Sequence, residues 1–198
     1  MVVGVLGLQG DFAKHIDILN SLEQTAVVVK THRDLKDISG LIIPGGESTT
    51  LSLLLEAQGL YEDIKSLISD QKLPVFGTCA GMVMLAKSLV DAKEGQKTFG
   101  TMDISVKRNA FGSQISSFEK SLFVEGIDSG PVHAVFIRAP YVVRVGESVS
   151  VLADIEHLGT RYPVVCREGS TLVSAFHPEI VGDARLHRLW LEYCVYDG

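Results

Sequence analysis

The chain has 198 residues, of which 46% are hydrophobic and 21% are charged, and its formal net charge is −6. A length close to the roughly 150 residues of an ordinary domain predicts a single domain over residues 1–198. The composition excludes a disordered or collagen-like chain, and the negative charge does not favour binding to nucleic acid or to an anionic membrane. No apolar run approaches the roughly 18 residues needed to span a bilayer.

Three cysteines, Cys79, Cys166 and Cys194, are an odd number and do not make a disulfide framework. The first eleven residues lack the basic stretch and the small-residue cleavage site of a secretory signal. Both features predict a cytoplasmic protein. The sequence also lacks metal-ligand spacing, a dinucleotide fingerprint and a P-loop lysine, so we expect neither a metal ion nor a cofactor.

Apolar runs alternate with helical patterns through the first 90 residues. Strands are expected over residues 2–8, 26–29, 41–43 and 74–76, and helices after Asp11, from Ser48 or Thr49, over 61–69 and over 82–86. Strands that are apolar along their whole length are covered on both faces. The pattern therefore predicts an α/β three-layer sandwich with a mostly parallel central sheet.

Most segments between residues 101 and 175 have strand patterns, which predicts an antiparallel or mixed extension of that sheet. The expected strands are 102–106, 132–137, 142–145, 149–153, 162–167 and 172–175. A final helix is expected from about Asp183, with Leu186 and Trp190 packed on the sheet. We expect His187 to lie on the opposite, solvated face of this helix.

The sharpest local signal is the segment Gly77–Gly81, which joins an expected strand to an expected helix. A Gly-x-Cys-x-Gly turn of this kind is typical of a nucleophile elbow, in which small neighbours avoid steric clashes at a strained central residue. The helix N-terminus favours the thiolate of Cys79, and the Ala80 N–H is placed to bind an oxyanion. Cys166 and Cys194 are expected to be ordinary core residues.

A thiolate nucleophile needs a base, and the base needs an orienting carboxylate. His177 follows the expected strand 172–176, and Glu179 comes two residues later. The imidazole could therefore face the elbow while the carboxylate binds its other nitrogen, although an ordinary loop histidine remains the alternative. The other histidines, at positions 15, 32, 133, 157 and 187, lack a nearby carboxylate at such a strand end.

The segment Pro44–Thr49 follows the third expected strand and contains two glycines before a helix start. Gly46 could supply a second oxyanion donor, or the segment could be a plain turn with a helix cap. Arg108 could hold a substrate carboxylate, although a lone Lys-Arg pair is usually just solvated.

Six sequence blocks together resemble the glutaminase subunit of pyridoxal 5′-phosphate synthase, a class I, triad-type glutamine amidotransferase family. The blocks are residues 5–10 (VLGLQG), 44–50 (PGGESTT), 77–81 (GTCAG), 108–112 (RNAFG), 136–140 (FIRAP) and 176–179 (FHPE). The resemblance covers nearly the whole chain and implies a flavodoxin-like fold.

The resemblance implies hydrolysis of L-glutamine to L-glutamate and ammonia through a thioester. Cys79 would attack the side-chain amide, His177 would shuttle protons and Glu179 would orient His177. Backbone N–H groups near Gly46 and Ala80 would hold the oxyanion.

The family's substrate contacts and partner are implied in the same way. Glutamine-binding positions correspond to Gly46, Glu47, Ser48, Arg108, Ile137 and Arg138. Ammonia would pass to a (β/α)8-barrel synthase subunit that makes pyridoxal 5′-phosphate (vitamin B6), with Gln9 near the coupling surface. Ser113 departs from the basic residue that is frequent there in the family. The alternatives are a different cysteine enzyme on a similar fold and a non-catalytic binding module.

Overall fold

A computed structural model describes residues 1–70, 72–109 and 117–196 of the chain. The first half contains strands β1 (Val2–Leu6), β2 (Thr25–Val29), β3 (Gly40–Ile43) and β4 (Val75–Thr78), and helices α1 (Phe12–Ser21), η1 (His32–Leu35), α2 (Ser48–Ala57), α3 (Tyr61–Ser69) and α4 (Ala80–Leu85). The second half contains β5 (Ala86–Leu89), β6 (Met102–Lys107), β7 (Ser117–Leu122), β8 (Val132–Ile137), β9 (Tyr141–Val145), β10 (Ser150–His157), β11 (Thr160–Glu168), β12 (Thr171–Ser174), α5 (Arg185–Trp190) and the π-helix η2 (Leu191–Tyr196).

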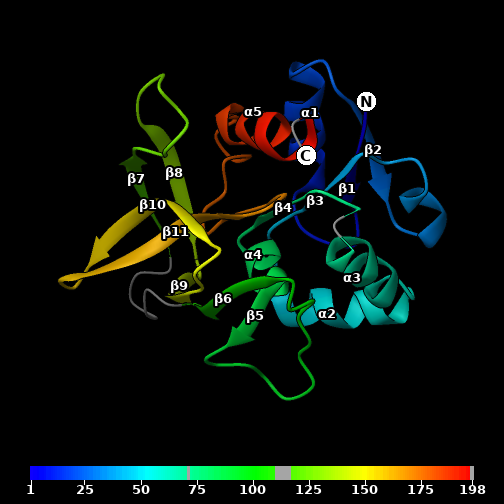
Figure 1. Cartoon of the computed structure of the whole chain (residues 1–198), viewed down its shortest axis with the longest axis horizontal. Helices are drawn as coiled ribbons and strands as arrows, with labels where there is room; N and C mark the ends of the chain where they lie inside the picture. The colour runs from blue at the N-terminus through cyan, green and yellow to red at the C-terminus, as the bar shows by residue number, and fades with distance from the viewer. Residues whose placement is uncertain (71, 110–116, 197–198) are drawn as a thin grey trace.

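The central sheet has seven strands in the order β10-β11-β12-β4-β3-β1-β2. Its five strands from β12 to β2 pair in parallel, whereas β11 and β10 pair antiparallel. Helices α1 and α5 cover one face of this sheet, and α2, α3 and α4 lie on the other (Figure 1). This arrangement confirms the predicted three-layer α/β sandwich with an antiparallel extension.

The remaining strands do not join the central sheet, whereas the sequence predicted that the strands after residue 101 would extend it. Strands β5, β6 and β9 form a three-stranded sheet, and β7 and β8 form a two-stranded one. Strands β5 and β7 were not predicted from the sequence. Most residues of β7 are exposed or half-buried polar ones, so this strand has no apolar alternation to detect.

The prediction that His187 is solvated is wrong, because its side chain has no exposed surface. Helix α5 packs over the sheet and also against α1, so more of its circumference is covered than an amphipathic pattern predicts. The ring of His187 packs edge-on against Phe76 of β4, with centroids 5.2 Å apart. Cys166 is fully buried in β11, as expected. The Cys194 side chain, the segment 110–112 and Ser113 lie outside the part of the chain that is described.

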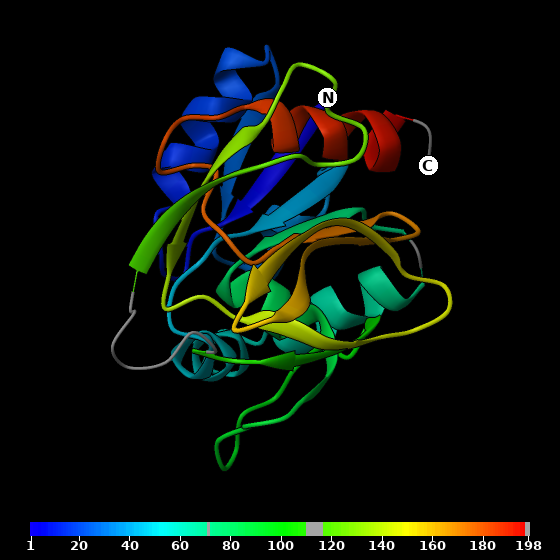
Figure 2. The same ribbon diagram turned by 90° about the vertical axis from the view of Figure 1, so that its left-hand side faces the viewer.

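The parallel strands bring four distant loops to one edge of the sheet. Because neighbouring parallel strands end on the same side, the residues after β1, β3, β4 and β12 come together there (Figure 2). Those loops carry Gln9, Gly46, Cys79 and His177. The predicted chemistry is thus concentrated where α/β folds place their sites.

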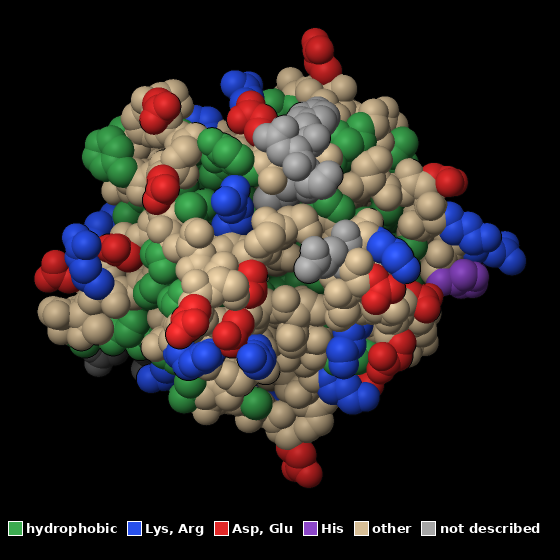
Figure 3. All heavy atoms as spheres, viewed as in Figure 1, with side chains coloured by type: hydrophobic (Ala, Val, Ile, Leu, Met, Phe, Trp, Pro, Cys, Tyr) green, Lys and Arg blue, Asp and Glu red, His purple; other side chains and the backbone are tan. Residues whose placement is uncertain are grey.

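The surface carries charges of both signs. On the face shown in Figure 3, Lys and Arg side chains lie interspersed with Asp and Glu. Among the described residues, the helices are too short or too polar to cross a membrane.

Glu47, rather than a serine or threonine, caps helix α2. Its carboxylate accepts hydrogen bonds from the backbone N–H groups of Thr49 (3.2 Å) and Thr50 (2.7 Å), and from the Thr50 hydroxyl (2.9 Å). Burial alone would raise the pKa of Glu47, but these hydrogen bonds outweigh it and lower the pKa from 4.5 to about 2. The cap thereby fixes the loop that contains Gly46 at the start of α2.

Replacing the cap should cost stability in a pH-dependent way. We expect Glu47→Ala to lower the free energy of unfolding by about 1 kcal/mol near neutral pH. Because the pKa of Glu47 is lower in the folded protein (about 2) than in the unfolded chain (4.5), its carboxylate stabilises the fold fully above pH 4.5. This contribution is lost as the pH falls from 4.5 through 2. In urea unfolding at pH 7 and pH 3, the deficit of the variant should therefore shrink at pH 3. The control is Glu62→Ala, on the exposed first turn of α3. If Glu47→Ala lost the same unfolding free energy at pH 7 and at pH 3, the prediction would be contradicted.

Candidate active site

Cys79 occupies a strained turn between β4 and α4. Its backbone has φ 49° and ψ −99°, a region that non-glycine residues rarely adopt. A Cβ at Gly77 would lie 2.7 Å from the backbone of Gly81, and a Cβ at Gly81 would lie 2.2 Å from the Ile43 carbonyl oxygen. The expected steric need for glycine on both sides of the elbow is confirmed.

Neighbouring strands hold this turn in place. The Cys79 N–H donates to the Ser174 carbonyl on β12 at 2.7 Å. The residue Cys79 is 6% exposed, and its sulfur lies 4.0 Å from the carbonyl oxygen of Ile137. A sulfur that is buried but still reachable from the edge of the sheet is suited to react with a small bound molecule.

The imidazole of His177 lies beside the elbow. A Cβ built at Gly45 would lie 2.2 Å from Cε1 of His177 and 3.3 Å from Cβ of Cys79. Gly45 therefore leaves the space in which these two side chains meet. The backbone N–H of His177 donates to the backbone carbonyl of Val135 at 2.9 Å, which fixes the backbone that carries the ring.

The carboxylate of Glu179 holds the far side of the imidazole. Nδ1 of His177 donates to Oε1 of Glu179 over 2.6 Å, and Glu179 is only 3% exposed. Burial alone would lower the pKa of His177, but the contacts with Cys79 and Glu179 outweigh it and raise the pKa to about 10. A raised pKa favours the protonated ring near neutral pH, and a protonated imidazole is able to donate a proton to a leaving group.

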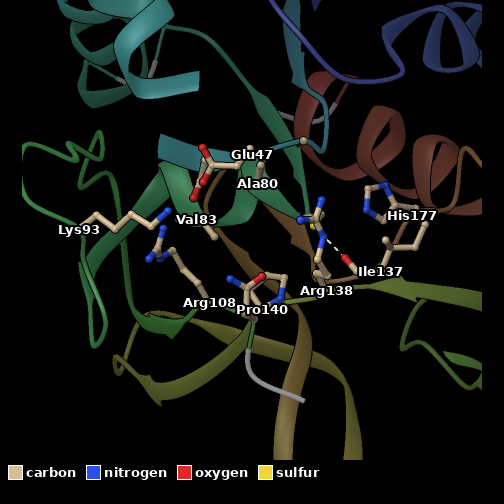
Figure 4. A pocket seen from close by; sticks show the side chains of 13 residues that line it. Glu47, Ala80, Val83, Lys93, Arg108, Ile137, Arg138, Pro140 and His177 are labelled. Carbon is tan, nitrogen blue, oxygen red and sulfur yellow. Dashed lines mark hydrogen bonds between the residues drawn. The ribbon is translucent and has the colours of Figure 1, made fainter. Parts of the chain in front are cut away.

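A pocket of about 240 Å³ opens in front of this group. It is smaller than the roughly 300–1,000 Å³ of drug-sized sites, so it suits a small ligand. In Figure 4, Lys93 and Arg108 lie at one end of the pocket and His177 at the other. Two cationic side chains thus lie at the end of the pocket away from His177, and a third, Arg138, lies closer to His177.

The predicted substrate contacts all line this pocket. They are Gly46, Glu47, Ser48, Arg108, Ile137 and Arg138, and the predicted oxyanion residue Ala80 lines it too. Gly46 has φ +149°, a conformation that favours glycine. Their proximity is a structural result, whereas their binding roles stay predictions.

Several of these side chains are already held by protein partners. The buried guanidinium of Arg108 donates to the Thr49 hydroxyl (3.2 Å) and to the Asp91 carbonyl (2.9 Å). The hydroxyl of Ser48 accepts from the Gln96 side chain at 3.0 Å. Arg138 is exposed and has φ +45°, a strained value of the kind found at functional sites.

Gln9 does not belong to the pocket lining. Its side-chain N–H donates to the Glu47 carbonyl at 2.7 Å and so supports the Gly46 loop from behind. The predicted role of Gln9 in coupling to a partner stays a prediction.

Sequence reasoning missed two features of the site. Lys93 lines the pocket from the turn after the unpredicted strand β5. His15 lies 3.6 Å from Glu179, which contradicts the expectation that no other histidine has a carboxylate near a strand end. Only the tertiary fold brings helix α1 to that carboxylate. Among the described residues, no group of three His, Cys, Asp or Glu side chains is arranged to hold a metal ion.

Comparison with known proteins gives a consistent picture of ancestry. The model of the SNO glutamine amidotransferase family matches residues 5–196. A Pelotomaculum thermopropionicum protein named pyridoxal 5'-phosphate synthase subunit PdxT is 48% identical over 198 residues, which are 100% of this chain and 97% of that protein. A protein of the same name from Clavibacter sepedonicus is 48% identical over 191 residues, covering 96% of this chain and 90% of the relative.

Solved structures agree with the observed fold. A crystal structure of a glutamine amidotransferase aligns with a TM-score of 0.89 at 45% identity, covering 98% of this chain and 99% of the other. A glutamine amidotransferase from Thermotoga maritima shares the fold, with a TM-score of 0.60 at 14% identity over 96% of this chain and 83% of the other. Because the family model and the relatives span almost the whole sequence, this chain belongs to the SNO glutamine amidotransferase family.

Proposed function

We propose that residues 1–198 act as one glutaminase domain that hydrolyses L-glutamine to L-glutamate and ammonia. One observation carries this proposal, namely the buried contact of Glu179 with a His177 ring that meets Cys79 at the elbow. Membership of a glutamine amidotransferase family supports the substrate. A binding module would have no use for the strained backbone of Cys79.

The first half of the reaction forms a thioester. The Cys79 thiolate attacks the carbon of the substrate's side-chain amide, and backbone N–H groups near Gly46 and Ala80 stabilise the resulting oxyanion. The protonated ring of His177 then gives its proton to the amide nitrogen. The carbon–nitrogen bond breaks, ammonia leaves, and the acyl group remains on sulfur.

The second half returns the enzyme to its starting state. Neutral His177 takes a proton from a water molecule as that water attacks the thioester carbonyl. The carbon–sulfur bond breaks, glutamate leaves, and the thiolate again faces a protonated imidazole. Glu179 keeps Nδ1 of the ring protonated and oriented throughout.

The polarity of the pocket orients the substrate in this proposal. The cationic end, formed by Lys93 and Arg108, would take the α-carboxylate of glutamine, since guanidinium groups bind carboxylates with defined geometry. The opposite end would then hold the side-chain amide against Cys79. Glu47, Ser48, Ile137 and Arg138 would complete the walls of the pocket.

The names of the relatives suggest where the ammonia goes. We infer that the chain works in the cytoplasm as part of a pyridoxal 5'-phosphate synthase and delivers ammonia to a (β/α)8-barrel synthase subunit. Identity of 48% over the full chain to a protein named as a subunit of that synthase supports this inference. Gln9, behind the Gly46 loop, would lie near the coupling surface.

Removal of the nucleophile gives the most direct mutational test. We expect Cys79→Ala to lower glutamate release by roughly 10⁴-fold or more, because the variant lacks the sulfur that would form the acyl-enzyme. Binding to the synthase partner should persist. The matched control is Cys166→Ala, whose thiol is buried in β11 and has a pKa raised by burial to about 12. Activity of Cys79→Ala within tenfold of wild type would refute the assignment.

The two other members of the triad should differ in importance. His177→Ala removes the proton carrier, whereas Glu179→Ala removes only the group that orients it. We therefore expect the loss of kcat to be larger for His177→Ala than for Glu179→Ala. Steady-state glutamate release with the synthase partner present would measure both variants, and the reverse order would contradict these roles.

A further inference from the structure

A buried chain of polar side chains continues beyond the triad, into the layer between α1, α5 and the sheet. His15 of α1 and His187 of α5 have no exposed surface. Nδ1 of His15 lies 2.8 Å from Nε2 of His187. On its other side, Nε2 of His15 lies 3.6 Å from Oε2 of Glu179. Glu179 is therefore flanked by two imidazoles, and only one of them belongs to the triad.

The second oxygen of Glu179 lacks a hydrogen bond. Oε1 is satisfied by His177, but Oε2 is buried without a partner within hydrogen-bond distance. A buried carboxylate oxygen that lacks a donor is costly, because it has lost water and gained nothing in return. Nε2 of His15, at 3.6 Å, is close enough to become that donor after a small adjustment.

Hydrogen-bond accounting fixes the tautomers of both histidines. If His15 donated through Nδ1, His187 would have to carry its proton on Nδ1, and Nδ1 of His187 has no partner. The lone pair on Nε2 of His15 would then also face the Glu179 carboxylate. The opposite arrangement avoids an unpaired buried N–H: His187 donates through Nε2 to His15, and Nε2–H of His15 points towards Glu179.

Both rings act here as neutral groups. Burial, together with the nearby His187 and His177, holds the pKa of His15 well below its usual range. Burial lowers the pKa of His187 to about 3 against the opposing influence of Asp183. His15 is thus a neutral donor that leaves the charges of Glu179 and His177 balanced. The hydroxyl of Thr78, 3.5 Å from Nε2 of His15, is the other polar atom at this nitrogen.

We propose that His15 is a positioning residue that donates from Nε2 to Oε2 of Glu179, with His187 fixing its tautomer. This inference rests on the proposed glutaminase function. The contact closes to a hydrogen bond when the pocket is occupied, as catalytic hydrogen bonds do on forming the reactive complex. With both oxygens engaged, the carboxylate cannot rotate, so the His177 ring stays aimed at Cys79. Outer partners of this kind change activity by roughly 10- to 100-fold in metal sites.

The test compares His15→Gln with His15→Met in the full chain with its synthase partner. The two side chains have similar length, but only glutamine retains an N–H donor. We expect His15→Met to lower kcat by roughly 10- to 100-fold with KM changed less than about twofold, because orientation of the triad and not substrate binding is lost. His15→Gln should restore kcat to within about fivefold of wild type.

A control separates this role from packing. Leu19→Ala empties buried space on the same helix, so it should lower the melting temperature without a comparable fall in kcat. Equal kcat for His15→Gln and His15→Met, or a loss confined to KM, would overturn the positioning role. Wild-type protein that releases no glutamate would instead refute the proposed function itself. If His15→Met does not fold, His187→Met, which removes the donor to His15, must lower kcat in its place.

Discussion

The hydrogen bond between Nδ1 of His177 and Oε1 of Glu179 is the interaction on which the site depends. It spans 2.6 Å, is shielded from water, and holds the imidazole beside Cys79. Its partners come from the loop after β12, while the sulfur comes from the loop after β4. The parallel pairing of those two strands therefore sets the distance between the sulfur and the imidazole. Each layer of helices serves to bury the sheet that makes this pairing rigid.

The site combines strain with tight packing. Cys79 is held at φ 49°, which costs of order 1–3 kcal/mol at such positions. Glycines at 77 and 81 allow the turn, and the backbone hydrogen bond from Cys79 to Ser174 holds it against the neighbouring strand. The Gly46 loop is fixed in a similar way, by the Glu47 cap on one side and Gln9 on the other. The rigidity of the scaffold is what allows the unfavourable turn to persist.

Local patterns predicted the fold, and the proximity of Cys79, His177 and Glu179, for a physical reason. Apolar strands, the Gly-x-Cys-x-Gly turn and the spacing of His177 and Glu179 are local signals, and a parallel sheet brings their ends together. What was missed depends on tertiary contacts. His187 lies on a helix with two covered sides, His15 reaches Glu179 only across the layer, and polar strands such as β7 lack an apolar period. Lys93 joins the pocket through a turn after one of the unpredicted strands.

Covalent labelling tests the central claim most directly. A chloroketone analogue of glutamine presents an electrophilic carbon where the amide would lie, so the thiolate should form a carbon–sulfur bond as chloride leaves. Peptide mass spectrometry should find one label per chain, on Cys79, with the rate of labelling suppressed by glutamine and strongly reduced in His177→Ala. Labelling of another residue, or unlabelled Cys79 in a protein that still releases glutamate, would contradict the account.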